Sequence, residues 1–431
     1  MSVLSGVSSV GPAEPVIFIG AGVASITAIE EMRGHGYDKP VVLLSKERHV
    51  PYDRPPLSKD VLYGERLDGV PLRPDSFYDD NAVDLRLGVE ATTLDLDVNE
   101  VVTRSGERLT GGTVVLATGG EPRRLPLPGT DLRGVCELRT LDDALELKAQ
   151  LTPGVRLVVI GGGFIGTEVA AAGVLRGAEV TILEAQAAPL AAVLPHVASY
   201  VVDHHRSHGV TVRGGVSVTG FEAARDGSDN RVTGVRLQQD DELVPADVVV
   251  VGVGMRPSDE LARRAGIATD NGITVDQWSR TSNPTVFAIG DVASRSDGHG
   301  GHRRTEHWQS AVHDGRRLAR NLLGLEATPT QPPWFWSDQF DVNIQMAGHP
   351  DENDGRIVRG DPQQLRCTVL FHRRGALTGV VTLNNGKDVR PALELIRSGR
   401  LVDLDSLSDP SVQLRTLARE SIDALGRPQT S

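Results

Sequence analysis

Cysteine is scarce in this chain of 431 residues, which contains only Cys136 and Cys367. The two lie far apart in the sequence, and neither belongs to a CxxC motif. The sequence therefore encodes neither a disulfide framework nor a local dithiol redox pair. This cysteine usage favours a reducing compartment, and we expect a cytoplasmic protein.

Long apolar runs are also missing, since none approaches the roughly 18 residues that a membrane-spanning helix needs. Residues 1–15 have neither a basic segment nor an apolar one, so we expect a short disordered leader and not a signal peptide. Acidic residues outnumber basic ones, and the net charge is −12. Without a strong basic patch, such a chain attracts neither nucleic acid nor an anionic membrane surface. Small ligands or local docking partners are favoured.

The chain is rich in glycine, and some of its glycines belong to a sequence pattern that occurs twice. The first copy is PVIFIGAGVASITAIEEMRGHG at 15–36, followed by a second apolar run at 41–45. The second copy is RLVVIGGGFIGTEVAAAGVLRGA at 156–178, followed by EVTILEA at 179–185. Each copy predicts a strand, a glycine turn, a helix and a second strand, which is the βαβ half of a doubly wound nucleotide-binding sheet.

The glycine turn has a physical logic. Its first glycine permits the tight bend, its second lets the backbone approach a pyrophosphate, and its third lets the helix pack on the strand. The second copy fills these places with Gly161, Gly163 and Gly166. The first copy has Gly20 and Gly22, and Ser25 takes the third place as another small residue. Two copies in this context predict two dinucleotide sites.

The residue that ends each second strand bears on the ligand. Glu184 ends the second copy, where a carboxylate binds the ribose hydroxyls of an adenosine and repels a 2′-phosphate, so NADH is favoured over NADPH. In the first copy the acid position holds Lys46, followed by Glu47. Either Glu47 takes the acid's place with a small register shift, or the backbone holds the ribose.

Six segments in register carry a resemblance over nearly the whole chain. They are YDRPPLSK, LATGGEPRRLP, GGGFIGTEVA, FAIGDVA, EHWQSA and PWFWSDQFD. In this order and spacing they resemble the FAD-dependent ferredoxin reductases of oxygenase systems, within the pyridine nucleotide-disulfide oxidoreductase superfamily. The resemblance implies an α/β, glutathione-reductase-like fold with two Rossmann-type domains and a C-terminal α/β domain. The FAD domain would span 12–122 and 247–329, the NAD domain 123–246, and the C-terminal reductase domain 330–431.

The resemblance also implies site residues. Gly20, Gly22 and Ala24 would meet the FAD pyrophosphate, Arg54 and Lys59 would lie along the flavin, and Asp291 would hold the ribityl chain. Ala91, Thr118, Gly119, Arg139 and Trp308 would complete the FAD site, with Trp308 at the pyrimidine end of the flavin ring. Gly161, Gly163, Gly166 and Glu184 would hold NADH, and Gly254 would line the nicotinamide approach. Ala192 stands where relatives often have an arginine, which implies weaker NADH binding.

Lys59 and Glu168 are the implied catalytic residues. The family pairs this lysine and glutamate beside the flavin, where a cation stabilises negative charge on the reduced ring and the carboxylate positions the cation.

The implied activity is electron transfer from NADH through FAD to a small acidic ferredoxin, which would supply a haem-thiolate monooxygenase or a Rieske oxygenase. Three arginine pairs, at 303–304, 316–317 and 373–374, are either plain solvated charges or a local basic docking patch. Alternatives are a rubredoxin reductase, an NADH oxidase-type flavoenzyme, and a flavoprotein like apoptosis-inducing factor that acts mainly by partner binding. No metal site is expected, because no Glu or Cys cluster accompanies the i, i+4 pair His204 and His208.

Overall fold

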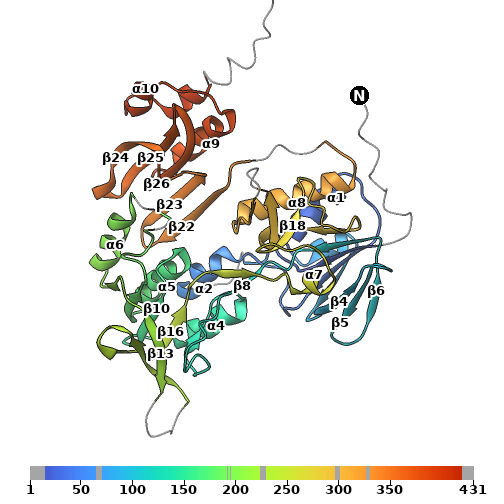
Figure 1. Ribbon diagram of the computed structural model, residues 1–431, viewed down its shortest axis with the longest axis horizontal. Coiled ribbons are helices and arrows are strands. Elements are labelled where there is room, and N and C mark those ends of the chain that lie inside the picture. Colours follow the sequence, from blue (N-terminus) through green and yellow to red (C-terminus); the bar gives the residue numbers. More distant parts are fainter. Residues whose placement is uncertain are drawn as a thin grey trace, which may run out of the picture. The chain divides into compact units, whose positions relative to one another are not determined.

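The computed structural model (Figure 1) describes residues 15–64, 70–191, 193–194, 196–223, 230–296, 301–326 and 331–419. Most of the expected leader and Ala192 lie outside these residues. The chain divides into two compact units, each assembled from separate stretches. The first comprises Met1–Pro55, Leu67–Glu121 and Met255–Thr330, and the second comprises Pro56–Arg66, Pro122–Gly254 and Gln331–Ser431. The three-domain division stays a prediction.

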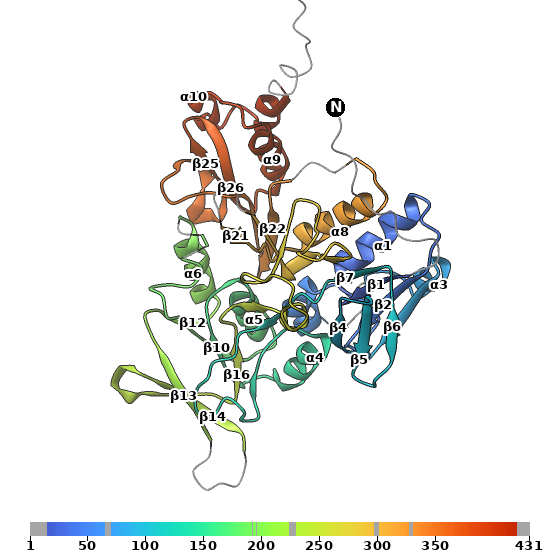
Figure 2. The ribbon, with the colours of Figure 1, turned by 45° about the vertical axis from the view of Figure 1, so that its right-hand side comes forward.

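The core of the first unit is a five-stranded parallel sheet in the order β19-β7-β1-β2-β3. Its strands are β1 (Val16–Ile19), β2 (Val41–Ser45), β3 (Val83–Leu87), β7 (Thr113–Leu116) and β19 (Val286–Ala288). Every residue of β1, β2, β7 and β19 is buried and most are apolar, as expected for strands covered on both faces. Helices α1 (Val23–Gly34) and α8 (Trp308–Leu322) lie side by side and pack with this sheet in one apolar cluster (Figure 2).

Smaller elements complete the first unit. Two three-stranded sheets are formed by β4 (Ala91–Asp95), β5 (Glu100–Thr103) and β6 (Arg108–Thr110), and by β18 (Ile273–Val275), β20 (Ala293–Ser296) and β21 (His302–Arg303). Short helices are α3 (Ser76–Asp80), α7 (Glu260–Arg264) and η3 (Gly290–Val292). Strands β8 (Gly120–Pro122) and β17 (Met255–Pro257), and helix η1 (Pro55–Ser58), lie where the chain passes from one unit to the other.

A second five-stranded parallel sheet, in the order β12-β11-β10-β16-β9, lies in the second unit. Its strands are β9 (Val135–Cys136), β10 (Arg156–Ile160), β11 (Glu179–Leu183), β12 (Thr211–Arg213) and β16 (Val248–Val251). The helices of this part are α2 (Asp60–Tyr63), α4 (Leu141–Gln150), α5 (Phe164–Leu175) and α6 (Ala198–Ser207). Strands β13 (Val218–Ala223), β14 (Val232–Leu237) and β15 (Leu243–Pro245) form an antiparallel sheet, with η2 (Gln239–Asp241) between the last two. Both predicted βαβ units are confirmed, each with its glycine turn between strand and helix.

The C-terminal part of the second unit is an antiparallel sheet in the order β22-β23-β26-β25-β24. Its strands are β22 (Trp334–Gln339), β23 (Val342–Gly348), β24 (Gly355–Asp361), β25 (Arg366–Arg373) and β26 (Ala376–Leu383). Its helices are α9 (Val389–Ser398), α10 (Leu404–Ser408) and the short η4 (Pro362–Gln364) and η5 (Gly386–Asp388). One apolar cluster joins this sheet to α6, and another joins it to α9 and α10. Among the described residues, no helix has the length and apolar character that a bilayer crossing needs.

Candidate functional site

The first glycine turn connects β1 to α1. Gly20 has a φ of +105°, and a Cβ built on it would lie 2.2 Å from the Ala117 carbonyl oxygen, so only glycine fits this position. Gly22 precedes α1, and a Cβ there would meet nothing within 4 Å. The Ser25 hydroxyl donates to the Gly20 carbonyl at 2.6 Å and is buried, which explains why serine serves at the third place. The helix N-terminus is therefore left open to a ligand, as a pyrophosphate requires.

Four of the predicted FAD residues come together around this turn. Ala24 lies against Gly290, since a Cβ built on Gly290 would be 3.3 Å from the Ala24 Cβ, and Asp291 is the next residue in η3. Thr118 and Gly119 follow β7, the neighbour of β1 in the sheet. The turn, η3 and these two residues thus meet at the carboxyl ends of adjacent parallel strands, where such sheets bind ligands.

The structure separates the roles of Lys46 and Glu47 at the end of β2. The Lys46 side chain is 58% exposed and pairs with Glu121 at 3.1 Å. The Glu47 side chain is only 16% exposed, pairs with Arg54 at 2.7 Å and accepts a short hydrogen bond from the Tyr52 hydroxyl. Burial raises the pKa of the Glu47 carboxyl, but the Arg54 charge and the two hydrogen bonds outweigh burial, so the pKa lies below its usual value. Glu47 is therefore an ionised acceptor.

A small pocket lies beside this carboxylate and reaches the glycine turn. Its lining includes Gly22, Ser45 and Glu47. The Val89 amide donates to the Ser45 carbonyl at 2.8 Å, which brings Ala91 at the start of β4 to the same end of β2. The geometry thus agrees with the alternative in which Glu47, and not Lys46, takes the acid's place.

Replacing Glu47 with alanine is expected to weaken FAD binding about 10-fold or more, because a hydrogen bond to a charged group contributes about 1.5–3 kcal/mol. FAD titration of the apoprotein, followed by flavin fluorescence, measures this. Lys46→Ala is the matched control and should leave affinity nearly unchanged, since an exposed pair is worth about 0–1 kcal/mol. Equal losses in the two variants would contradict the assignment.

Trp308 begins α8, and its indole N–H donates to the Asp53 carboxylate at 2.7 Å. Burial raises the pKa of the Asp53 carboxyl, and the indole hydrogen bond opposes that rise only in part. Asp53 belongs to the YDRPPLSK segment but was not among the residues predicted from the sequence. Its partner is far along the chain, so no local signal could have identified it.

The second glycine turn repeats the geometry of the first between β10 and α5. Gly161 has a φ of +97°, and a Cβ there would lie 2.4 Å from the Gly252 carbonyl oxygen. A Cβ on Gly166 would lie 2.0 Å from the Gly161 carbonyl oxygen, so the helix is in close contact with the turn. A Cβ on Gly163 would meet nothing within 4 Å. This turn too is constrained at its first and third glycines and open at its second.

The Glu184 carboxylate, just after β11, lies at this turn. It accepts the Gly162 amide at 2.6 Å and the Gln186 amide at 2.7 Å. The carboxylate is therefore fixed next to the backbone where the pyrophosphate is expected. Gly254 follows β16 with a φ of +101°, and its carbonyl accepts the Arg123 amide at 2.9 Å.

Arg139 lies just before α4, where its amide donates to Asp143 at 3.0 Å. Because Arg139 belongs to the second unit and the glycine turn of the FAD site to the first, the predicted contact of Arg139 with FAD stays a prediction. The YDRPPLSK segment is likewise divided, since Arg54 belongs to the first unit and Lys59 to the second.

Lys59 and Glu168 form a buried ion pair, as the resemblance implied. The Lys59 Nζ lies 2.9 Å from Glu168 Oε1, and the two side chains are 10% and 3% exposed. Glu168 is also the acceptor of two hydroxyl groups, from Ser58 in a short hydrogen bond and from Ser337 at 2.6 Å. A buried carboxylate is tolerated when its charge is paired and its oxygens are hydrogen-bonded. Neither serine was among the residues predicted from the sequence.

The hydrogen bonds continue from Ser337 along β22 to α6. Gln339 Nε2 donates to the Ser337 hydroxyl at 3.0 Å, and Gln339 Oε1 lies 2.8 Å from His205 Nε2. All three side chains are buried. Burial lowers the pKa of His205 to about 4, so this imidazole is neutral at physiological pH and donates its Nε2–H. This series of hydrogen bonds ends on Glu168 Oε1, the same oxygen that pairs with Lys59.

Neither cysteine offers redox chemistry. Both are free thiols, and the Cys136 Sγ donates to the Val249 carbonyl at 3.3 Å. Burial raises the pKa of the Cys136 thiol to about 12 and that of the Cys367 thiol to about 11. Because the thiolate is the reactive form, both groups are inert near neutral pH.

Comparison with known proteins agrees with this geometry. A family model described as pyridine nucleotide-disulphide oxidoreductase matches residues 14–315, and one described as reductase C-terminal matches residues 334–418. The 5,5'-dehydrodivanillate O-demethylase ferredoxin reductase subunit of Sphingobium sp. is 36% identical over 405 residues, covering 93% of this chain and 97% of the relative. The ferredoxin–NAD(+) reductase component of the anthranilate 1,2-dioxygenase system of Burkholderia cepacia is 38% identical, covering 94% of this chain and 99% of the relative. Among solved structures, putidaredoxin reductase in covalent complex with putidaredoxin matches with a TM-score of 0.89 and 33% identity, covering 95% of this chain and 98% of that one.

Proposed function

Because the chain belongs to the pyridine nucleotide-disulphide oxidoreductase family, we propose that it is an FAD-dependent NADH:ferredoxin reductase of an oxygenase system. The observation that carries the proposal is the presence of two open dinucleotide cradles, one in each unit, in a chain whose only two thiols are inert. Electrons taken from NADH have no thiol pair to enter, so they leave for an external acceptor.

FAD and NAD(H) are the cofactors of this family, and both cradles fit a dinucleotide. The space at Gly22 and Gly163 shows that the cradles fit a dinucleotide. A Cβ at either position would meet nothing within 4 Å, so a pyrophosphate can approach the helix N-terminus. FAD, when bound, supplies the capacity to take a hydride from NADH and to release electrons singly. Gly20, Ala24 and Asp291 would hold FAD in the first unit, and Glu184 would bind the NADH ribose in the second.

The chain's own contribution is positioning and electrostatics. Lys59 is a buried cation, and its ion pair with Glu168 offsets the free energy cost of burying that charge. Trp308 is fixed by its bond to Asp53 and therefore presents its ring in one orientation. Groups held in this way are what electrostatic stabilisation of developing charge requires.

The acceptor is proposed to be a small acidic ferredoxin, which in turn supplies a haem-thiolate monooxygenase or a Rieske oxygenase. The names of the relatives support this class of acceptor. The cytoplasm is the proposed location, since free thiols suit a reducing compartment.

The arginine pairs differ in their environments. The Arg304 side chain is only 7% exposed and pairs with Glu306 at 2.6 Å, and Arg373 pairs with Asp354 at 2.9 Å. Burial lowers the pKa of Arg317, which is a further sign that this guanidinium is not a freely solvated charge. Arg303, Arg316, Arg373 and Arg374 are nevertheless exposed, so both alternatives, solvated charges and a docking patch, stay predictions.

NADH-driven reduction of cytochrome c by the FAD-loaded chain tests the proposal. A [2Fe–2S] ferredoxin added as carrier is expected to stimulate the rate strongly, because the ferredoxin takes electrons from the flavin and delivers them to cytochrome c. The control is the same mixture without ferredoxin. A rate that is indifferent to ferredoxin, with the flavin still bleached by NADH, would contradict the proposed acceptor and leave an oxidase-type enzyme. Failure of NADH to bleach the flavin would contradict the reductase assignment itself.

A further inference from the structure

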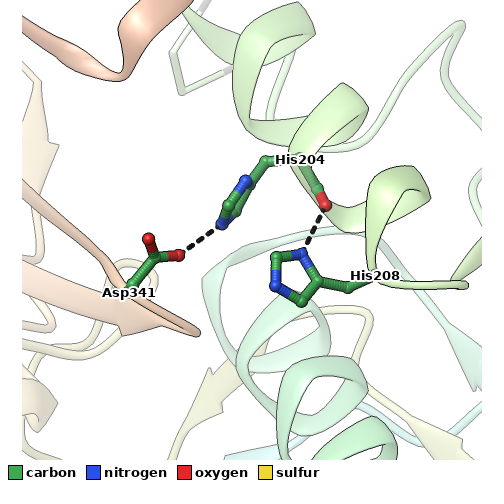
Figure 3. Close-up of side chains that lie close together, drawn as sticks. All are labelled: His204, His208 and Asp341. Carbon is green, nitrogen blue, oxygen red and sulfur yellow. Dashed lines mark hydrogen bonds and ion pairs between the residues drawn. The ribbon is translucent and has the colours of Figure 1, made fainter.

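We propose that His204, His208 and Asp341 form a binding site for a zinc-like divalent metal ion on the second unit (Figure 3). No metal site is expected from the sequence, because no Glu or Cys cluster accompanies the two histidines. The fold supplies a third ligand from the turn between β22 and β23, far along the chain. The site is separate from the residues that would hold FAD and NADH.

The three side chains converge from two elements. His204 lies on α6 and His208 directly follows it, so the two rings are on one face of the helix end, with centroids 4.5 Å apart. His204 Nε2 lies 2.7 Å from Asp341 Oδ1. One ligand atom from each residue lies within 4.8 Å of the others. Ligands at about 2.0–2.2 Å from zinc are about 3.3 Å apart in a tetrahedron, so small side-chain rotations complete the geometry.

His208 is already oriented as a ligand. Its Nδ1–H donates to the His204 backbone carbonyl at 2.9 Å, which leaves the Nε2 lone pair available. Its ring is stacked on Phe340, with centroids 4.1 Å apart and planes 16° apart. Histidine ligands of metals ordinarily donate their other ring N–H to a hydrogen-bond acceptor, which fixes the orientation of the ring. Figure 3 shows this imidazole beside His204, with Asp341 facing His204.

The charge at this place also suits a cation. The carboxyl end of a helix carries partial negative charge from its unpaired carbonyls, and α6 ends here. The Asp341 side chain is 78% exposed and adds a full negative charge. The neighbouring Arg206 is directed to Asp203, with which it pairs at 2.9 Å. Two imidazoles and one carboxylate are a donor set for zinc, with the fourth position left to water.

Binding of an ion would join α6 to the turn between β22 and β23. That turn follows the strand that carries Ser337 and Gln339, which hold Glu168. The site would thus act as a structural clip within the second unit, and zinc would stabilise the folded state by mass action.

Equilibrium dialysis of the chelator-treated, FAD-loaded chain against Zn²⁺, followed by metal analysis, tests the site. One zinc per chain is expected, with affinity at least 10-fold lower in His208→Ala and in Asp341→Asn. His35→Ala is the matched control, because His35 also ends a helix and faces a carboxylate, Glu31 at 3.7 Å, without a second histidine. It should bind zinc as the original chain does. Zinc should also raise the melting temperature of the original chain but not that of His208→Ala.

The EPR spectrum of bound Cu²⁺ gives a readout that does not depend on stability. Nitrogen couplings from two imidazoles are expected in the original chain and from one in His208→Ala. Retention of FAD by each variant shows that it is folded. The proposal is overturned if the original chain binds no more zinc than a His204→Ala/His208→Ala double variant, since the cluster would then be an ordinary His–Asp ion pair only.

Discussion

Replacing Glu168 with glutamine is expected to slow reduction of the flavin by NADH about 10²-fold, the range seen when one preorganised electrostatic group is lost. Glu168 Oε1 lies 2.9 Å from the buried Lys59 Nζ, and the neutral amide of glutamine removes the charge of this ion pair. Without that charge the Lys59 ammonium is no longer held in its position, which is why the rate is expected to fall. Single-turnover mixing of the FAD-loaded variant with NADH measures the rate, and NADH affinity should change little.

A second variant is expected to distinguish an effect on the stability of the fold from an effect on the rate of flavin reduction. Removing one partner of a buried pair costs about 3–5 kcal/mol, whereas replacing both partners by neutral groups is often tolerated. Lys59→Met/Glu168→Gln should therefore recover much of the stability that Glu168→Gln loses, but none of the rate. A double variant that recovers both would show that the pair serves the fold alone.

The milder control is Ser337→Ala, which removes one hydrogen bond at 2.6 Å and leaves the ion pair in place. Such a loss costs about 1–3 kcal/mol at a buried acceptor, so a smaller fall in rate is expected than for Glu168→Gln. A larger fall would mean that the serine, and not the charge of Glu168, positions Lys59.

The parts of this site that the sequence predicted are those set by local spacing. Gly20, Gly161 and Gly166 were identifiable because the backbone at a strand-to-helix turn allows no side chain there, and the turn lies within a few residues of both elements. Glu184 was identifiable because the second strand of a βαβ unit ends at a fixed place next to that turn. At Lys46 and Glu47 the spacing left two alternatives, and the side-chain environment was needed to favour one.

The parts that the sequence did not predict are contacts between distant segments. Ser58 and Ser337 both bind Glu168, but serine is common and nothing near either residue marks a partner. The same holds for Asp53, which binds Trp308, and for Asp341, which joins His204. Such contacts depend on how separate elements pack, and single-sequence patterns carry no information on that. Nor does the sequence show that Arg304 and Arg373 are paired with carboxylates in the fold.

Replacing Glu184 with alanine is expected to lower kcat/KM for NADH about 10- to 100-fold, because hydrogen bonds to a charged acceptor contribute about 1.5–3 kcal/mol each. The value for NADPH should change much less, since the same substitution removes a repulsion between the carboxylate and a 2′-phosphate. The ratio of the two kcat/KM values is the measurement. The original chain should strongly prefer NADH, and equal rates with both nucleotides would contradict the role of Glu184.

Glutamine at the same position separates charge from structure. The carboxylate also accepts the Gly162 amide at 2.6 Å and the Gln186 amide at 2.7 Å, so alanine loosens the turn as well as removing the charge. Glu184→Gln keeps one acceptor oxygen for the turn but loses the negative charge, and it should raise NADPH use relative to NADH while losing less total activity than alanine does. Glu47→Ala, in the other unit, should leave the ratio unchanged when FAD is saturating. If Glu184→Gln keeps the full preference for NADH, the discrimination arises from the shape of the turn, and the carboxylate serves only to hold it.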